Sequence, residues 1–185
     1  VGDSLRHAAF QVASIMTTTG FATTDFDQWP EFSRTLLVML MFIGACAGST
    51  GGGIKVSRIL MYMKTIKKEL GILIHPRSVK IVMMDGKKLD HPVVRAANIF
   101  LISYAGILVA SILLLTIDNY DFTTNVTAVI SALNNIGPGL SLVGPAGNFA
   151  FFSGFSKYVL MFDMLAGRLE IFPMLLLFVP YTWKK

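Results

Sequence analysis

Long apolar runs alternate along the chain with short polar strings that are rich in glycine. The run 93–117 holds 25 residues and a single charge near its start. A helix of that length reaches about 37 Å, which exceeds the roughly 30 Å hydrocarbon core of a bilayer. The run 155–179 is equally long but contains Asp163, Arg168, Glu170 and Pro173. We therefore expect two spanning helices, the second at an energetic cost.

Two other apolar runs, 5–16 and 123–133, are too short to span a bilayer. As helices they reach only about 17 Å, and each ends in a polar string that contains glycine. Helices of that length are buried core helices or re-entrant segments, and irregular backbone at membrane depth is tolerated where it is buried or lines a watery cavity. The pattern favours two re-entrant helices beside a pore. A further run, 34–62, is interrupted at 44–53 and predicts one broken helix.

The chain matches itself at two related offsets. At an offset of 117 the matched pairs are Val12 with Val129, Ser14 with Ser131 and Gly20 with Gly137. At an offset of 123 they are Phe32-Ser33-Arg34 with Phe155-Ser156-Lys157, Leu37 with Leu160, Met41 with Met164 and Gly44 with Gly167. Chance supplies single matches in apolar sequence, but it supplies a repeated order of elements less easily. The sequence thus predicts a repeated unit of half-helix, glycine string, external loop and inner helix.

Composition supports a membrane protein. Of 185 residues, 54% are hydrophobic and 15% are charged. A typical soluble domain is about 45–50% apolar and about 25% charged, so the polar residues here are too few to coat a globule. The single cysteine, Cys46, excludes an internal disulfide and a multi-cysteine zinc site. This composition argues against an ordinary cytosolic enzyme.

The basic residues gather in the middle of the chain. Ten of the 16 lie between positions 55 and 95, whereas the stretches 1–34 and 118–157 carry six acidic residues against three basic ones. By the positive-inside rule the middle loop is cytoplasmic and the flanking stretches are external. The alternative, a nucleic-acid patch, is disfavoured because apolar runs bracket the basic block and no aromatic residues interleave it to stack on bases.

The two polar strings are Thr17-Thr18-Thr19-Gly20-Phe21 and Asn134-Asn135-Ile136-Gly137-Pro138-Gly139. A cation that crosses a membrane exchanges its hydration water for oxygen ligands, and backbone carbonyls can supply them. Glycine permits the positive φ that turns successive carbonyls the same way, and Thr and Asn side chains can bond behind the strand. A helix entering from outside also directs its partially negative C-terminus at the cavity. The alternative is a pair of ordinary loops, in which these residue types are common.

Four segments together resemble the Trk/Ktr/HKT superfamily of potassium transporters, most closely the C-terminal half of the bacterial Trk membrane subunit: TTTGF, GACAGSTGGGIK, NNIGPG and AGRLE. The resemblance covers essentially the whole chain. It implies an all-α membrane protein in which four helix, re-entrant pore-helix, helix repeats surround a potassium-channel-like pore. The chain then holds two of the four: the third repeat without its first helix at 1–63 and the fourth at 93–185, joined by a basic linker at 64–92.

The resemblance also implies roles for residues. The K⁺ filter is assigned to Thr18, Thr19, Gly20, Asn135, Ile136 and Gly137. Filter support is assigned to Thr17, Phe21, Asn134, Pro138 and Gly139. An intramembrane gating loop is assigned to Gly44, Gly48, Ser49, Thr50, Gly51, Gly52 and Gly53. A glycine-rich loop has little side chain to pack and should move easily, although a close helix crossing with small residues is the alternative.

Arg168 is the implied pore barrier. It lies near the middle of its predicted helix, where a charge is expensive and usually functional. At 100° per residue it shares a face with neither Asp163 nor Glu170, so we expect it to face the lumen below the filter. An ion pair with an acidic residue on a helix outside this chain is the alternative.

The expected function is K⁺ uptake across the bacterial inner membrane by a multi-pass protein that is not an enzyme and has no cofactor besides the transported ion. The resemblance implies four partners: the bilayer, the missing N-terminal half, a second copy in a homodimer, and a cytosolic nucleotide-binding regulatory subunit near the cytoplasmic linker 64–92. A non-conducting packing subunit and a Na⁺/K⁺-permeable relative remain alternatives, as does a dimer of this chain that supplies four strings.

An enzymatic function fits the sequence less well than transport. The stretch Gly48–Lys55 misses the phosphate-binding pattern G-x-x-x-x-G-K-[ST] by one residue and lacks its magnesium-binding hydroxyl. The three histidines are scattered, and none forms the H-x-x-x-H pair of a metal hydrolase.

Overall fold

The computed structural model describes residues 2–46, 48–49, 51–76, 81–84, 86–169, 171–177 and 179–183. The chain is mainly helical, as the sequence predicts. Its α-helices are α1 (Gly2–Met16), α2 (Glu31–Met41), α3 (Val56–Ile74), α4 (His91–Leu115), α5 (Phe122–Leu133), α6 (Gly154–Arg168) and α7 (Phe172–Leu177). Short 3₁₀ turns are η1 (Phe26–Gln28), η2 (Thr116–Asp118), η3 (Ser141–Val143) and η4 (Pro180–Trp183).

Two small two-stranded ladders complete the structure. β1 (Ile43–Gly44) pairs in parallel with β2 (Ile54–Lys55), so the ends of the glycine-rich stretch 44–53 meet. β3 (Met83–Met84) pairs antiparallel with β4 (Lys87–Lys88) between α3 and α4. The stretch 44–53, called the glycine loop from here on, is therefore closed at its neck by backbone hydrogen bonds.

The longest apolar helix is α4. Together with η2 it runs from His91 to Asp118, and among the described residues it alone is long and apolar enough to cross a membrane. Pro92 lies in its first turn, where a missing backbone N–H costs little, and Asn119 ends η2 with a left-handed φ of 57°. The predicted helix at 93–117 thus corresponds closely to α4.

The expectation of one continuous helix over 155–179 was wrong. α6 ends at Arg168, and α7 begins only at Phe172. Ile171 has a positive φ of 62° and donates its backbone N–H to the Ala166 oxygen at 2.8 Å, which turns the chain. Ile171 is also buried, at 1% exposure, in a cluster with Phe100 of α4 and Leu133 of α5. Pro173 then falls in the first turn of α7, a position that proline favours.

The linker predicted at 64–92 also begins differently, because α3 continues to Ile74. The segment after Lys64 is rich in Lys, Glu, Leu and Ile, most of which are good helix formers. Only the second part of the predicted linker, which includes the β3–β4 hairpin, is non-helical. Tyr62 of α3 donates a hydrogen bond to the Ala97 oxygen, and Arg58 of α3 lies 4.0 Å from the centre of the Phe100 ring, so α3 contacts α4 near its start.

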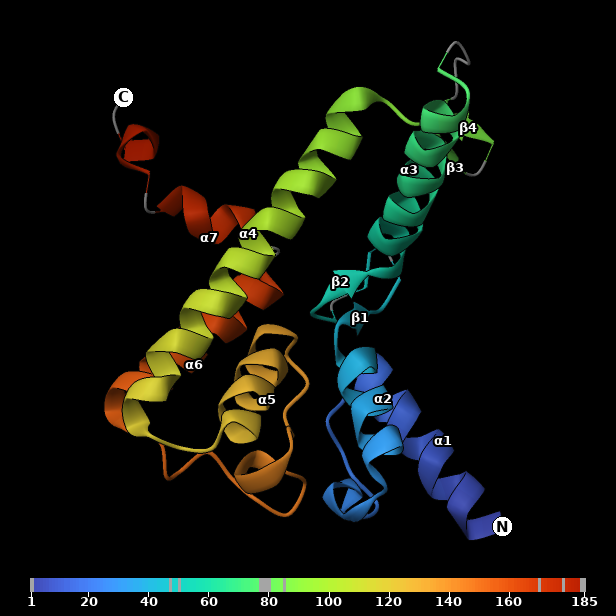
Figure 1. The fold of residues 1–185 in the computed structure, drawn as a ribbon. Coiled ribbons are helices and arrows are strands. Elements are labelled where there is room, and N and C mark those ends of the chain that lie inside the picture. The colour runs from blue at the N-terminus through green and yellow to red at the C-terminus, as the bar shows by residue number, and fades with distance from the viewer. Residues whose placement is uncertain are drawn as a thin grey trace.

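Helix α5 is the centre of the assembly. Figure 1 shows this short helix beside α4 and α6 on one side and α1 and α2 on the other. Nearly every residue from Thr124 to Leu133 is buried. One apolar cluster joins α5 to α1 and α2 through Ile130, Ile15 and Leu37, and two others join it to α4 and α6.

The outward faces of the helices are strongly apolar. Large hydrophobic side chains with more than 60% exposure lie on α1, α2, α3, α4 and α6 and include Leu5, Phe32, Leu73, Ile102, Leu113 and Tyr158. Apolar surface spread over so many helices marks contact with lipid or with further protein.

The packing of α6 on α5 yields a stability prediction. A methyl group at Gly167 would lie 1.8 Å from the Leu133 carbonyl oxygen, so Gly167→Ala should push α6 from the end of α5. We expect a loss of about 1–3 kcal/mol, because overpacking outweighs the gain in helix propensity. Gly106→Ala, in α4, is the matched control, since no atom lies within 4 Å of its added methyl group. Thermal unfolding of the purified full-length protein in detergent measures both, and equal unfolding temperatures would contradict this packing.

Candidate functional site

The two polar strings, 17–21 and 134–139, lie against each other although more than a hundred residues separate them. A methyl group built on Gly20 would lie 2.0 Å from the carbonyl oxygen of Ile136, and one built on Gly137 would lie 3.9 Å from the Cα of Gly20. The backbones therefore meet with no side chain between them. The ring of Pro138 lies alongside, with its Cδ 3.4 Å from the same Gly20 position.

Both strings leave their helices with the same backbone geometry. After α1, the N–H groups of Thr17, Thr18 and Thr19 donate to the oxygens of Ala13, Ile15 and Ser14 at 3.0, 3.1 and 2.9 Å. After α5, those of Asn134, Asn135 and Ile136 donate to Ile130, Ala132 and Ser131 at 3.0 Å each. Every pair matches its counterpart at the offset of 117. φ is positive at the matched positions too, 55° at Thr18 and Asn135, 78° at Gly20 and 117° at Gly137.

This geometry leaves main-chain oxygens available. The string N–H groups cap the last helical carbonyls, which would otherwise lack partners. None of the hydrogen bonds among the described residues ends on a carbonyl oxygen of the six predicted filter residues 18–20 and 135–137. A positive φ is rare for a β-branched residue such as Thr18 and is typical of functional sites.

Two buried serines stabilise the strings from behind, and the sequence reasoning did not assign them. Ser14 of α1 donates to the oxygen of Phe21 at 2.6 Å, and Ser131 of α5 accepts from the N–H of Gly137 at 3.0 Å. Both are at least 94% buried. Their match at the offset of 117 was the signal that could have identified them. We expected Thr and Asn side chains in this role: Asn134 and Asn135 do bond neighbouring backbone, whereas Thr17 bonds Thr19 and the Ala13 oxygen.

Asn134 anchors the second string. It is fully buried, donates to the Ile130 oxygen at 2.7 Å and accepts from the hydroxyl of Tyr104 of α4 at 2.8 Å. Its neighbour Asn135 donates to the Met164 oxygen of α6 at 3.0 Å. The string is therefore bonded to α4, α5 and α6 together. Of the other predicted support residues, Gly139 donates its N–H to Val143 at 2.7 Å, whereas the Phe21 side chain is 70% exposed.

The glycine loop packs against both strings. Methyl groups built on Gly52 and Gly53 would lie 2.3 Å from the Asn134 backbone oxygen and 3.1 Å from its side-chain oxygen. One built on Gly51 would lie 3.1 Å from the Thr18 hydroxyl. Within the loop, Gly44 fits against the oxygen of Gly52, and Ser49 donates its N–H to Cys46 at 3.1 Å. Gly48 has an open environment at a φ of 84°, and Thr50 lies outside the described residues.

Arg168, the predicted barrier, occupies the last turn of α6. Its neighbour Gly167 packs on the Leu133 oxygen, which places this turn next to the start of the second string. Glu170 lies outside the described residues. Asp163, one helical turn and a residue earlier on α6, is fully buried and accepts from the Ser111 hydroxyl of α4 at 2.7 Å.

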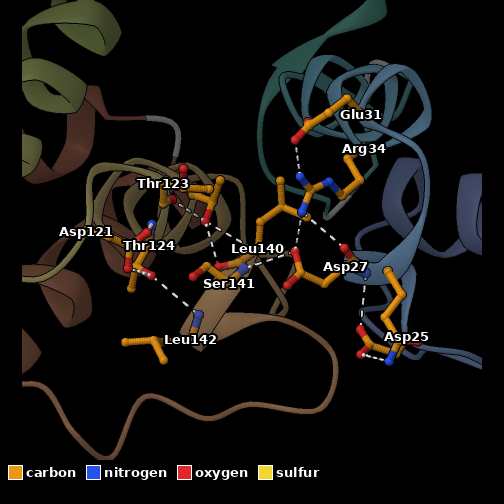
Figure 2. A network of polar contacts seen from close by, with 12 residues as sticks. Asp25, Asp27, Glu31, Arg34, Asp121, Thr123, Thr124, Leu140, Ser141 and Leu142 are labelled. Carbon is orange, nitrogen blue, oxygen red and sulfur yellow. Dashed lines mark hydrogen bonds and ion pairs between the residues drawn. The ribbon is translucent and has the colours of Figure 1, made fainter.

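An acidic network joins the turns that follow the two strings (Figure 2). Asp27, after the first string, accepts from the N–H of Ser141, after the second, at 3.1 Å. The same carboxylate pairs with Arg34 at 3.2 Å, and Arg34 also bonds Glu31. Arg34 also donates to the backbone oxygen of Asp27 at 3.0 Å. At the offset of 123 the equivalent residues make the same contact, because Lys157 donates to the backbone oxygen of Ala150 at 2.7 Å.

Asp121 caps α5, the helix that presents the second string. Its carboxylate accepts from the Thr124 hydroxyl at 2.5 Å and from the Thr124 N–H at 2.9 Å. These bonds favour the ionised form and hold the pKa of Asp121 below its ordinary value of 3.8. The Thr124 hydroxyl also accepts from the N–H of Leu142 at 3.4 Å, which links the cap to η3.

Comparisons with known proteins agree on one family. The sequence model of TrkH, described as a cation transport protein, matches residues 1–185. The chain is 41% identical over 182 residues to the Trk system potassium uptake protein TrkH of Salmonella typhimurium, covering 98% of this chain and 37% of that protein. For the TrkH of Vibrio parahaemolyticus the identity is 44%, with the same coverage. The chain thus spans 37% of the length of these curated relatives.

The chain is also similar to a solved structure. The crystal structure of the potassium transporter TrkH from Vibrio parahaemolyticus superimposes with a TM-score of 0.89 at 44% sequence identity. The match covers 98% of this chain and 38% of that one.

The Asp121 cap predicts a pH dependence. Asp121→Ala should destabilise the protein by about 0.5–2 kcal/mol at pH 7, a usual cost for a lost N-cap. The pKa of Asp121 is lower in the folded protein than in the unfolded chain. The stabilisation by the Asp121 cap is therefore present above the unfolded-state pKa and is lost as pH falls through the folded-state pKa. The difference between wild type and variant should therefore be constant from pH 8 to 5 and shrink below pH 3.8. Unfolding midpoints across this range measure it, and Asp3→Ala, at an exposed first-turn acid of α1, is the control. A difference that vanishes by pH 5 would contradict the cap.

Proposed function

Because the chain belongs to the TrkH family of cation transport proteins, we propose that it forms part of a membrane pore that takes up K⁺. Residues 18–20 and 135–137 line the filter of that pore as two of four strings, and the rest of the protein supplies the other two. The relatives' names describe potassium uptake and transport rather than catalysis, and the chain's share of their length is consistent with two of four repeats.

One observation carries the proposal: two strings with the same backbone geometry meet at Gly20 and Ile136. Each follows a short helix, and each carries positive φ at the same two positions. A K⁺ ion that sheds its water needs several oxygens at once, and backbone carbonyls from neighbouring strings supply them. Two strings that touch through glycine bring such oxygens together without side chains in the way.

The surrounding contacts suit an ion filter. The C-terminal ends of α1 and α5 both point at the strings, and their partial negative charge favours a cation. Ser14, Ser131 and Asn134 hold the strings from behind, so the oxygens keep their positions when the ion leaves. Preorganised dipoles of this kind need no reorganisation as each ion arrives.

We further propose the roles of the two elements below the filter. The glycine loop, in contact with Thr18 and Asn134, restricts the path of the ion and moves to open it. Arg168, at the end of α6, places a positive charge near the start of the second string and acts as a barrier to cations. The apolar outer faces of α4 and the other helices contact lipid or the remaining repeats of the same protein.

The proposed function also includes an orientation in the membrane and a set of partners. The basic segment that contains the end of α3 and the β3–β4 hairpin faces the cytoplasm, where a nucleotide-binding regulatory subunit docks. The acidic turns around Asp27 and Asp121 face the outside and offer the cation its first negative charges. A second copy of the full-length protein completes a homodimer in the inner membrane.

The filter assignment is tested by Gly20→Ala in the full-length protein. The added methyl group would meet the Ile136 oxygen at 2.0 Å, and φ at this position is 78°. We expect Rb⁺ uptake to fall by about tenfold or more, because displacing one carbonyl by overpacking removes an ion ligand. Gly106→Ala is the control and should transport normally. Normal uptake by a folded Gly20→Ala protein would remove the first string from the filter.

The barrier role is tested by changing the charge of Arg168. Arg168→Ala should raise ion flux, whereas Arg168→Lys, which keeps the positive charge, should leave it near the wild-type level. Flux through proteoliposomes that contain the full-length variants measures the effect. Equal flux in folded Arg168→Ala and wild-type protein would show that the charge does not limit permeation.

A further inference from the structure

Lys55 is a buried cation at the end of the glycine loop. It lies on β2, and only 5% of its surface is exposed. Its Nζ donates to the backbone oxygens of Ser49 at 2.6 Å and Gly51 at 2.5 Å. A lysine is rarely buried unless its ammonium group is paired or hydrogen-bonded, and here the oxygens of its own loop serve that purpose.

The loop is folded back onto this ammonium group. Its neck is closed where Gly44 pairs with Lys55 in the β1–β2 ladder, and the Val56 N–H donates to the Ala45 oxygen at 3.4 Å. The loop then turns back, so that the backbone oxygens of Ser49 and Gly51 lie within hydrogen-bond distance of the Lys55 ammonium group. Charge-assisted hydrogen bonds of this kind are among the stronger ones in proteins.

The residues that Lys55 holds are next to those that touch the strings. Gly51 accepts the lysine bond through its oxygen, while its Cα faces the Thr18 hydroxyl of the first string. Gly52, the next residue, packs on the Asn134 oxygen of the second string. Loss of the lysine bonds would therefore release the part of the loop that lies against both strings.

We propose that Lys55 is the positioning residue that holds the glycine loop closed against the filter strings. The ammonium group bonds two backbone oxygens, the type of ligand that also binds a K⁺ ion, but it is tethered and does not leave with the permeating ion. Opening of the loop requires these bonds to break. The link to ion flow rests on the proposed function, whereas the link to loop position does not.

Cys46 supplies a readout of loop position that is independent of transport. It is the single cysteine of this chain, its side chain is exposed, and its backbone oxygen accepts from Ser49 within the same turn. The thiol is already exposed, but the closed loop holds it in the turn with Ser49; a released loop should give the reagent access from more directions and so speed alkylation. The experiment uses the full-length protein in proteoliposomes, with any cysteines outside this chain replaced, and N-ethylmaleimide as the probe.

Lys55→Met removes the charge and keeps an unbranched side chain. We expect Cys46 alkylation and Rb⁺ flux each to rise by about tenfold, the factor expected when one or two charge-assisted hydrogen bonds are lost. Lys67→Met is the matched control, because Lys67 is exposed on α3, and it should change neither rate. Lys55→Gln, which keeps one donor, should give an intermediate alkylation rate and serves as the test if Lys55→Met does not fold.

The two readouts separate the possible failures. Unchanged Cys46 alkylation in a folded Lys55→Met or Lys55→Gln protein would overturn the proposal, whatever the flux. Faster alkylation with unchanged flux would support Lys55 as the residue that positions the loop and would instead contradict the gating role of the loop in the proposed function.

Discussion

The close approach of two backbones at Gly20 and Ile136 is the constraint on which the rest of the structure depends. The backbones of the two strings lie so close there that no Cβ atom would fit at Gly20. At this point the carbonyl oxygen of Ile136 lies against Gly20, and no hydrogen bond among the described residues ends on the carbonyl oxygens of residues 18–20 and 135–137. In the proposed pore these oxygens coordinate the cation that has given up its water.

Buried polar side chains make this approach possible. α5 is almost fully buried, yet it carries Thr124, Thr127 and Ser131, and Asn134 follows its last turn. The three α5 side chains bond backbone of the second string or of the turn after it, as Thr127 does when it accepts from the N–H of Leu140 at 3.0 Å, and Asn134 bonds the Ile130 oxygen and Tyr104. Buried polar groups cost free energy unless they are satisfied, so their concentration here identifies the part of the chain whose backbone must be held most accurately. The glycine loop adds a second layer, itself supported by the buried Lys55.

Much of this arrangement could be predicted from the sequence, because it depends on local signals. Gly20 and Gly137 follow half-length apolar helices, and the offset of 117 between them is reproduced by the hydrogen bonds of both strings. The break at Ile171 could not be read from hydropathy, because it depends on burial of that side chain between α4 and α5. Ser14 and Ser131 were missed although their partners are close in sequence and their match at the offset of 117 was a signal. Asp27 and Lys55 were missed because Asp27 bonds Ser141, far along the chain, and Lys55 bonds a loop that folds back, and single residue types do not reveal such contacts.

Direct observation of the ion tests the central claim most clearly. Crystals of the full-length protein grown with Rb⁺ in place of K⁺ would locate the ion by its anomalous scattering. If the two strings form the filter, a peak coordinated by carbonyl oxygens of residues 18–20 and 135–137 together is expected. A protein that transports Rb⁺ but binds it away from these two strings would contradict it.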